Sequence, residues 1–196
     1  MKPHRLETSH WVPYPIELVF AFFATPTNLP HLMPIWQQTR LESSRIQPPP
    51  PRPIAADPTL RFQSAASGVG SEMLFSFRPL PGIPLRTQWL ALITEFEWFH
   101  HFQDVQARGP FAHWKHRHSF AVETREGQPG TRIEDAVEYA LPMGPLGAIA
   151  HQLFVRQQMR ETFSWRQHRL TQILPAVARQ ATQRAADTEQ RNANPR

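Results

Sequence analysis

The segment from Trp114 to Phe120 places two histidines where they could do chemistry. It reads Trp-Lys-His-Arg-His-Ser-Phe, and alternate residues of a β-strand lie on opposite faces of the sheet. His116 and His118 would therefore share a face with both aromatic residues, which predicts that this face is buried. A buried imidazole needs a polar partner, because an unsatisfied polar group in an apolar site costs about 1–3 kcal/mol.

Two aspartates are predicted to supply these partners. A hairpin that turns at residues 109–110 would place Asp104 opposite or diagonal to His116. The next hairpin along the chain would place Asp135 opposite or diagonal to His118. The inner face of the sheet would then carry an alternating row of carboxylates and imidazoles.

Three interpretations of this row are open. In the first, each aspartate only satisfies a histidine in the wall of a cavity. In the second, the row orients the polar end of an otherwise apolar ligand, and Arg156 contacts an anionic group of that ligand. In the third, a histidine oriented by an aspartate acts as general acid or base on a carbonyl compound. The candidate catalytic residues are Asp104, His116, His118 and Asp135. The predicted ligand-binding residues are Trp89, Phe102, Asp104, Gln106, Trp114, His116, His118, Phe120, Asp135, Leu153, Arg156 and Phe163.

The same side chains also have the spacing of metal ligands. His116 and His118 lie two residues apart on one predicted strand, and Asp104 or Asp135 could be a third ligand of a zinc ion. The two aspartates are equally the natural hydrogen-bond partners of the rings. We therefore predict no metal and no cofactor.

The elements that must position these residues follow an α+β pattern. Residues 5–12 predict a strand, Pro15 to Thr25 a helix and residues 27–32 a second short helix. An apolar stripe between Leu146 and Leu174 predicts a long helix that Pro175 ends. Further strands are predicted at 37–46, 73–77, 85–96, 99–107, 111–123 and 131–141. Such a sheet of six to seven antiparallel strands curves, and the long helix would cover it and enclose a cavity.

One domain is expected over residues 1–174. Within it, the proline-rich segment 47–66 predicts an exposed loop or insertion that contributes nothing to the core. Residues 175–196 are polar. This C-terminal tail could extend the helix, but it is expected to fray rather than dock strongly.

Several stretches of the chain resemble a known family. Residues 12–23, with Asn28-Leu29 and Pro34 after them, look like the opening of the SRPBCC superfamily. Its helix-grip fold is shared by START lipid-transfer domains, birch-pollen-allergen-like proteins and polyketide cyclase/dehydrases. Residues 109–120 and 138–147 are similar to a bacterial branch described as ligand-binding or cyclase/dehydrase-like. The resemblance covers about residues 5–174 and implies a hydrophobic or amphipathic ligand, lipid-, polyketide- or isoprenoid-like, held between the sheet and the C-terminal helix.

Composition narrows the remaining classes. The chain has no cysteine, which excludes thiolate chemistry and disulfides, and its 21 basic residues are scattered, which argues against nucleic acid despite a net charge of +5. No run of residues is long and apolar enough for a transmembrane helix, and the opening residues lack the apolar core of a signal peptide, so we expect a cytoplasmic protein. The alternatives to ligand binding are a cyclase or dehydratase that uses His116 or His118, and a protein that docks on a larger partner, as coenzyme Q-binding and ribosome-associated relatives do.

Overall fold

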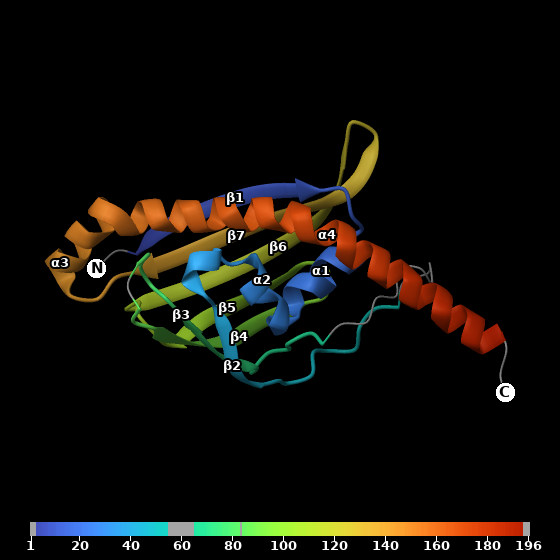
Figure 1. Cartoon of the computed structure of the whole chain (residues 1–196), viewed down its shortest axis with the longest axis horizontal. Helices are drawn as coiled ribbons and strands as arrows, with labels where there is room; N and C mark the ends of the chain where they lie inside the picture. The colour runs from blue at the N-terminus through green and yellow to red at the C-terminus, as the bar shows by residue number, and fades with distance from the viewer. Residues whose placement is uncertain (1–2, 55–64, 83, 194–196) are drawn as a thin grey trace.

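Seven antiparallel strands form one curved sheet that wraps around a long C-terminal helix in this computed structural model (Figure 1), which describes residues 3–54, 65–82 and 84–193. The strand order is β1-β7-β6-β5-β4-β3-β2, so the strands are neighbours in sequence except where β1 pairs with β7. The predicted helix-grip architecture is confirmed. In chain order the elements are β1 (His4–Val12), α1 (Ile16–Ala24), η1 (Pro26–Asn28), α2 (Leu29–Leu32), η2 (Ile35–Gln37), β2 (Arg40–Arg45), β3 (Glu72–Phe77), β4 (Thr87–Glu97), β5 (His101–Arg108), β6 (His113–Arg125), β7 (Gln128–Ala140), α3 (Gly144–Ala150), η4 (His151–Val155) and α4 (Arg156–Ala193).

The strand β6 alternates as its sequence predicts. Trp114, His116, His118 and Phe120 are buried, and the charged or small residues between them are not. Asp104 lies directly opposite His116 in the β5–β6 pair, and Asp135 lies directly opposite His118 in the β6–β7 pair. Both predicted registers are therefore observed, and the four polar side chains share the inner face of the sheet.

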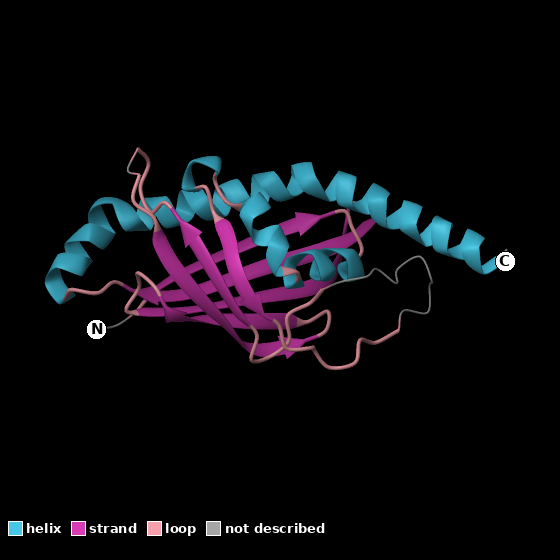
Figure 2. Cartoon of the chain, turned by 60° about the horizontal axis from the view of Figure 1, so that its bottom comes forward, coloured by secondary structure: helices cyan, strands magenta, loops and turns pink. Residues whose placement is uncertain are grey.

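The helix α1 fills one end of the sheet with aromatic rings. Phe20 is fully buried, and its ring centroid lies 5.0 Å from that of Phe120 and 6.0 Å from that of Phe102. Edge-to-face contacts of this kind add stability beyond the burial of apolar area. In Figure 2 the curved sheet lies below α4, and the short helix α1 lies beside the sheet.

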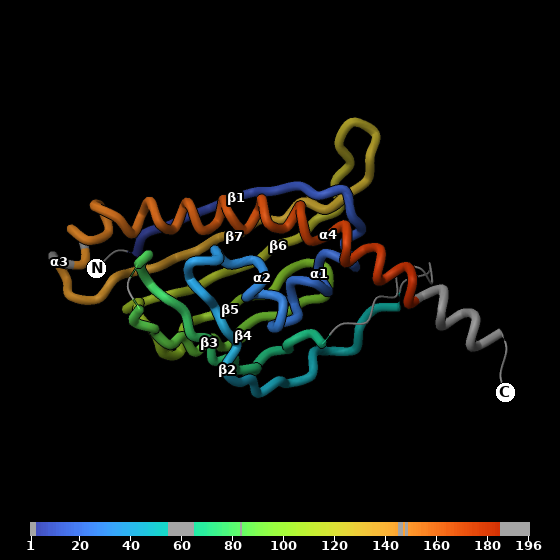
Figure 3. Tube along the Cα trace, viewed as in Figure 1, coloured from blue at the N-terminus to red at the C-terminus, as the bar shows by residue number. Residues whose placement is uncertain are grey.

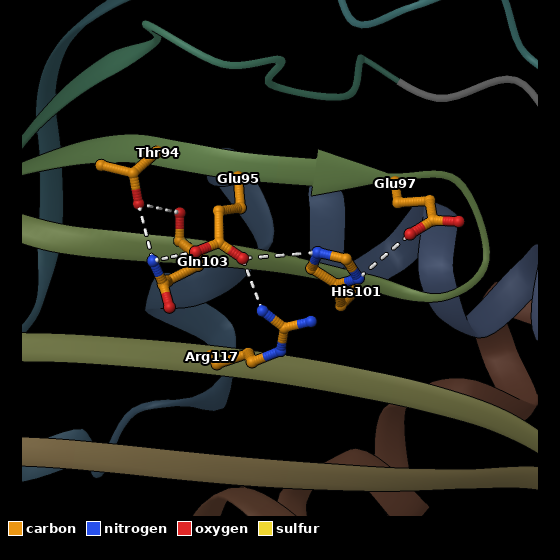
Figure 4. Close-up of polar contacts among 6 residues, drawn as sticks. All are labelled: Thr94, Glu95, Glu97, His101, Gln103 and Arg117. Carbon is orange, nitrogen blue, oxygen red and sulfur yellow. Dashed lines mark hydrogen bonds and ion pairs between the residues drawn. The ribbon is translucent and has the colours of Figure 1, made fainter.

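A polar network on the outer face supports an irregular part of the sheet (Figure 4). The pairing of β4 with β5 shifts just before Glu95, as in a β-bulge. Gln103 donates from Nε2 to Thr94 Oγ1 at 3.0 Å and to Glu95 Oε1 at 2.8 Å. Arg117 and His101 both approach the other carboxylate oxygen of Glu95. The network ties β4, β5 and β6 together where the bulge interrupts their backbone ladder.

The C-terminal helix is longer than predicted. The prediction that Pro175 ends it is wrong, because α4 continues through Pro175 to Ala193 and beyond the edge of the sheet (Figure 1). Leu174 is fully buried, and Val177 packs against the core on the other side of the proline. We attribute the continuation to this packing, which offsets the roughly 3 kcal/mol that a proline costs inside a helix.

The proline-rich segment has no helix or strand over residues 47–54, and residues 55–64 lie outside the described part of the chain. Its described ends are attached to the domain. Trp98 Nε1 donates to the carbonyl of Pro50 at 2.7 Å, and Ala66 is buried in the main hydrophobic core. The expectation that 47–66 contributes nothing to the core is therefore wrong at Ala66. The backbone hydrogen bond from Ser67 N–H to the carbonyl of Ala24 holds this residue next to the end of α1.

Candidate ligand-binding site

A cavity of about 370 Å³ lies between the inner face of the sheet and α4. This volume is within the range of about 300–1,000 Å³ that is typical of small-molecule sites. The segment from α1 to η2 lies beside α4 (Figure 3). Its residues line a third side of the cavity, where Gln37 Nε2 donates to Thr162 Oγ1 at 3.4 Å. The apolar part of the wall includes Leu29, Leu32, Phe75, Trp89, Ala91, Ile93, Phe102, Trp114, Met159 and Phe163.

One carboxylate, that of Asp135, holds both histidines. Its Oδ1 atom lies 3.0 Å from His116 Nε2, with hydrogen-bond geometry, and 2.7 Å from His118 Nδ1, a close polar contact without that geometry. Its Oδ2 atom accepts from Thr8 Oγ1 at 3.4 Å. Burial raises the pKa of Asp135, but the charge of His118 and the hydrogen bond from His116 outweigh it and hold the pKa well below its ordinary value.

The second carboxylate, that of Asp104, has weaker support. Trp114 Nε1 donates to its Oδ2 atom at 3.3 Å, and His116 Nδ1 lies 3.7 Å from its Oδ1 atom. Burial raises the pKa of Asp104 to about 6, although the charge of His118 and the bond from Trp114 act in the opposite direction. Burial and the charge of His118 lower the pKa of His116 to about 3, so this ring is neutral at pH 7.

These charges determine where the proton of His116 lies. An ionised carboxylate only accepts hydrogen bonds, so Nε2 of the neutral His116 carries the proton that it donates to Asp135. Nδ1 is then a bare acceptor, and it faces Asp104 Oδ1 across 3.7 Å. Above pH 6 both of these atoms are acceptors, so a group that donates hydrogen bonds would suit the space beside them.

Seven of the predicted residues line the cavity: Trp89, Phe102, Asp104, Trp114, His116, His118 and Phe163. Asp135 stands behind the histidines rather than on the cavity wall, where it orients both rings. The position of Phe120 differs from the prediction, because its ring is packed against those of Phe20 and Phe23 in the core.

The prediction is also wrong for Gln106, which does not face the cavity. Its Nε2 atom donates to the carbonyl of Phe111 at 2.8 Å, and its Oε1 atom accepts from the Phe111 N–H at 3.2 Å. The side chain thus closes the hairpin between β5 and β6. A nearby turn at Gly109 and Pro110 leaves those backbone groups without strand partners, so the amide serves structure there.

Leu153 and Arg156 do not line the cavity either, and for Leu153 the helix itself gives the reason. Leu153 is 74% exposed, and Arg156 lines a separate hollow near the start of α4. Both lie in or next to η4, which is one turn of π-helix. A π turn holds one more residue than an α turn, which rotates the preceding face of the helix by about 100°. The apolar stripe predicted from a regular period therefore fails before Val155.

Much of the apolar wall was not predicted, and neither were two polar residues that act on the aspartates, Thr8 and Arg166. Thr8 reaches Asp135 because β1 pairs with β7, and in this pair Thr8 lies directly opposite Asp135. Arg166 lines the cavity one helical turn after Phe163, with its guanidinium 4.9 Å from the Phe163 ring centroid. Its charge also lowers the pKa of both aspartates and of His116. The i, i+3 spacing from Phe163 was the available signal for Arg166.

Asp104, His116 and His118 each offer one ligand atom, and these atoms lie within 4.8 Å of one another. Two imidazoles and one carboxylate are suitable zinc ligands, and Asp135 would orient both rings from the second row. Asp135 contacts one nitrogen of each ring without an ion, whereas His116 Nδ1 and Asp104 Oδ1 have no hydrogen bond within the described part of the chain, so either a hydrogen-bond donor or a metal ion would suit them. We assign no metal to it, and the absence of one stays a prediction.

Comparison with known proteins shows the fold. No family model matches the chain, and no curated protein matches it. Protein Ms6760 from Mycobacterium smegmatis has a similar structure, with a TM-score of 0.57 and 16% identity over 88% of this chain and 91% of that one. Protein CV1439 from Chromobacterium violaceum is similar with a TM-score of 0.56 and 11% identity over 86% and 95% of the two chains. The fold is a helix grip. At these identities the similarity concerns the fold alone. Ara h 8.0201 is less similar, with a TM-score of 0.49 and 16% identity over 85% of this chain and 96% of that one.

Proposed function

We propose that the protein binds a hydrophobic or amphipathic small molecule in the cavity between the sheet and α4, as a member of the SRPBCC superfamily. The observation that supports this proposal most is the cavity itself, with about 370 Å³ of space and a mostly apolar wall. Burying an apolar ligand there gains roughly 25 cal/mol for each Å² removed from water. No helix among the described residues is long and apolar enough to span a membrane.

The polar cluster would select one end of the ligand. Asp104 Oδ1 and His116 Nδ1 both lack a hydrogen bond from any residue that the structure describes. Trp89, Trp114 and Phe163 would hold the apolar body beside them. A hydroxyl or amine donates to such acceptors, so we propose an otherwise apolar ligand with one donor group, such as a hydroxylated lipid, polyketide or isoprenoid.

Native mass spectrometry of the protein purified gently from its own host tests the binding proposal. A co-purifying molecule should appear as a mass difference that disappears on denaturation, and organic extraction should identify it. A matched pair of variants locates the molecule: Ala91→Leu fills the cavity wall, whereas Ala107→Leu makes the same change at an exposed position of β5. A molecule that remains bound to Ala91→Leu in the same amount would rule out this cavity as its site.

A cyclase or dehydratase activity is the second candidate. It is favoured by one observation, the raised pKa of Asp104, about 6, beside the bare Nδ1 of His116 on the cavity wall. The Asp104 carboxyl can gain or lose a proton near neutral pH, as general acid–base catalysis requires, while Nδ1 of the neutral His116 would accept a hydrogen bond from the protonated carboxyl or from the substrate. In this case His116→Gln would abolish turnover of a bound carbonyl compound and leave its binding in place. For a binding protein the same substitution would weaken binding only a few-fold. Docking on a larger protein partner remains a prediction.

A further inference from the structure

A second hollow lies where β1 begins and the C-terminal helix makes its π turn. Its volume is about 370 Å³. In Figure 1 the start of β1 and α3 lie at the same end of the domain. The residues that matter on its wall are His4, Arg5, Tyr139, His151, Arg156 and Arg160.

A buried imidazole forms the floor of this hollow. His151 is 7% exposed, and its Nε2 atom lies 2.9 Å from the hydroxyl of Tyr139. The ring of His4 stacks on that of His151, with centroids 3.4 Å apart and planes within 5°. Residue 151 is the first of the π turn, and π turns are frequent at functional sites. The floor is thus built from three elements and held in one arrangement.

The rim of the hollow carries unbalanced positive charge. Arg156 and Arg160 are exposed, lie four residues apart on α4 and have no ion pair with any described residue. Like charges at this spacing destabilise a helix unless something lies between them. Among the described wall residues none is a carboxylate. Glu7 is 2.8 Å from Arg5, and Glu138 lies opposite Arg5 in the β1–β7 pair, but neither acid lines the hollow or forms an ion pair with Arg156 or Arg160 that the structure describes.

The charge reaches the floor as well. Burial lowers the pKa of His151, and the charges of His4 and Arg156 lower it further. Burial raises the pKa of Tyr139, and the charges of Arg156 and Arg160 oppose that shift. A group with negative charge would relieve the repulsion among all of these residues at once.

We propose that this hollow binds a phosphate group through Arg156 and Arg160, with the stacked imidazoles of His4 and His151 beneath it. Planar guanidinium groups match phosphate oxygens with paired, charge-assisted hydrogen bonds. The space exceeds that of a phosphate ion, so the group would be part of a phosphomonoester. Its source is either a soluble metabolite or the headgroup of an anionic lipid. The site shares no residue with the large cavity, and its occupation does not depend on the proposed function of that cavity.

Titration of the full-length protein with inorganic phosphate tests the site. At constant ionic strength, phosphate should shift the NMR resonances of the His4 and His151 rings. The double variant Arg156→Gln/Arg160→Gln should weaken this binding by about tenfold or more, which corresponds to at least one charge-assisted contact. Arg179→Gln, an exposed change farther along α4, should bind phosphate like the unmodified protein.

Vesicles separate the two sources of the phosphate. The protein is sedimented with phosphatidylcholine vesicles that do or do not contain phosphatidic acid. Sedimentation that needs both phosphatidic acid and the two arginines supports the site with a lipid headgroup as its ligand, whereas phosphate shifts without sedimentation support it with a soluble phosphomonoester. The proposal is overturned when neither probe binds. It is also overturned when the double variant binds as well as Arg179→Gln does, provided that an unchanged melting temperature shows the double variant to be folded.

Discussion

Asp135 Oδ1 lies 2.7 Å from His118 Nδ1 across the β6–β7 pair, and the same oxygen accepts a hydrogen bond from His116. One buried acceptor therefore holds both rings that face the cavity. Removing one partner of a buried charged pair costs about 3–5 kcal/mol, because the other partner stays buried without compensation. The side chain of Asp135 should consequently matter more for stability than any other polar group on the inner face.

Asp135→Asn should lower the free energy of unfolding by about 3 kcal/mol at pH 7, measured by urea denaturation. The folded-state pKa of Asp135 is depressed, so its contribution is present above the unfolded value of 3.8 and is lost as the pH falls through the lower folded value. The difference between variant and parent should therefore narrow in strong acid. Glu134→Gln is the control, since that residue lies one position away on the outer face and is exposed. Equal effects of the two substitutions would contradict the bridging role of Asp135.

Asp104→Asn should raise the free energy of unfolding at high pH, whereas Asp135→Asn should lower it. The folded-state pKa of Asp104 is raised from 3.8 to about 6, so folding favours the protonated form. Stability from this group is present below pH 3.8 and declines as the pH rises to about 6. Asparagine keeps an acceptor for Trp114 but carries no charge, so the variant should be more stable than the parent by about 2 kcal/mol at pH 8 and about equal to it near pH 4. Urea denaturation at the two pH values measures this. A variant less stable than the parent at pH 8 would show that Asp104 is stabilised as a carboxylate.

Alternation along the strands was sufficient to predict the inner face, and hairpin turns were sufficient to predict which residues lie opposite His116 and His118. Sequence did not reveal that Asp135 serves both rings, because that depends on side-chain rotamers and on the curvature of the sheet. Neither the bulge in β4 nor the π turn at His151 has a local composition signal. The π turn adds one residue to the helical period, so a prediction based on a regular period placed Leu153 on the wrong face of the helix.

Ala91→Leu should empty the cavity of ligand without unfolding the protein. Ala91 is 5% exposed and lies on the cavity wall near the middle of β4. A leucine there projects into open space rather than into packed atoms, so overpacking strain should stay below about 1 kcal/mol. Ligand carried through purification should fall at least several-fold relative to Ala107→Leu, by quantitative extraction. A large drop in melting temperature with Ala91→Leu would instead show that the space is already filled by its neighbours.

Pro175→Ala should stabilise the protein. Proline cannot donate an N–H to the carbonyl of Thr171 one turn earlier, and its ring crowds that carbonyl. Alanine restores the bond and has the highest helix propensity, so the free energy of unfolding should rise by about 1–3 kcal/mol, with stronger helical circular dichroism. Gln180→Ala is the control, because that residue is exposed on the same helix and its replacement restores no backbone bond. The gain requires α4 to run unbroken from Leu174, which is buried, to Val177, which packs on the core. If Pro175→Ala gains no more than Gln180→Ala, the helix ends at Pro175 in solution, and the residues beyond it do not depend on the core.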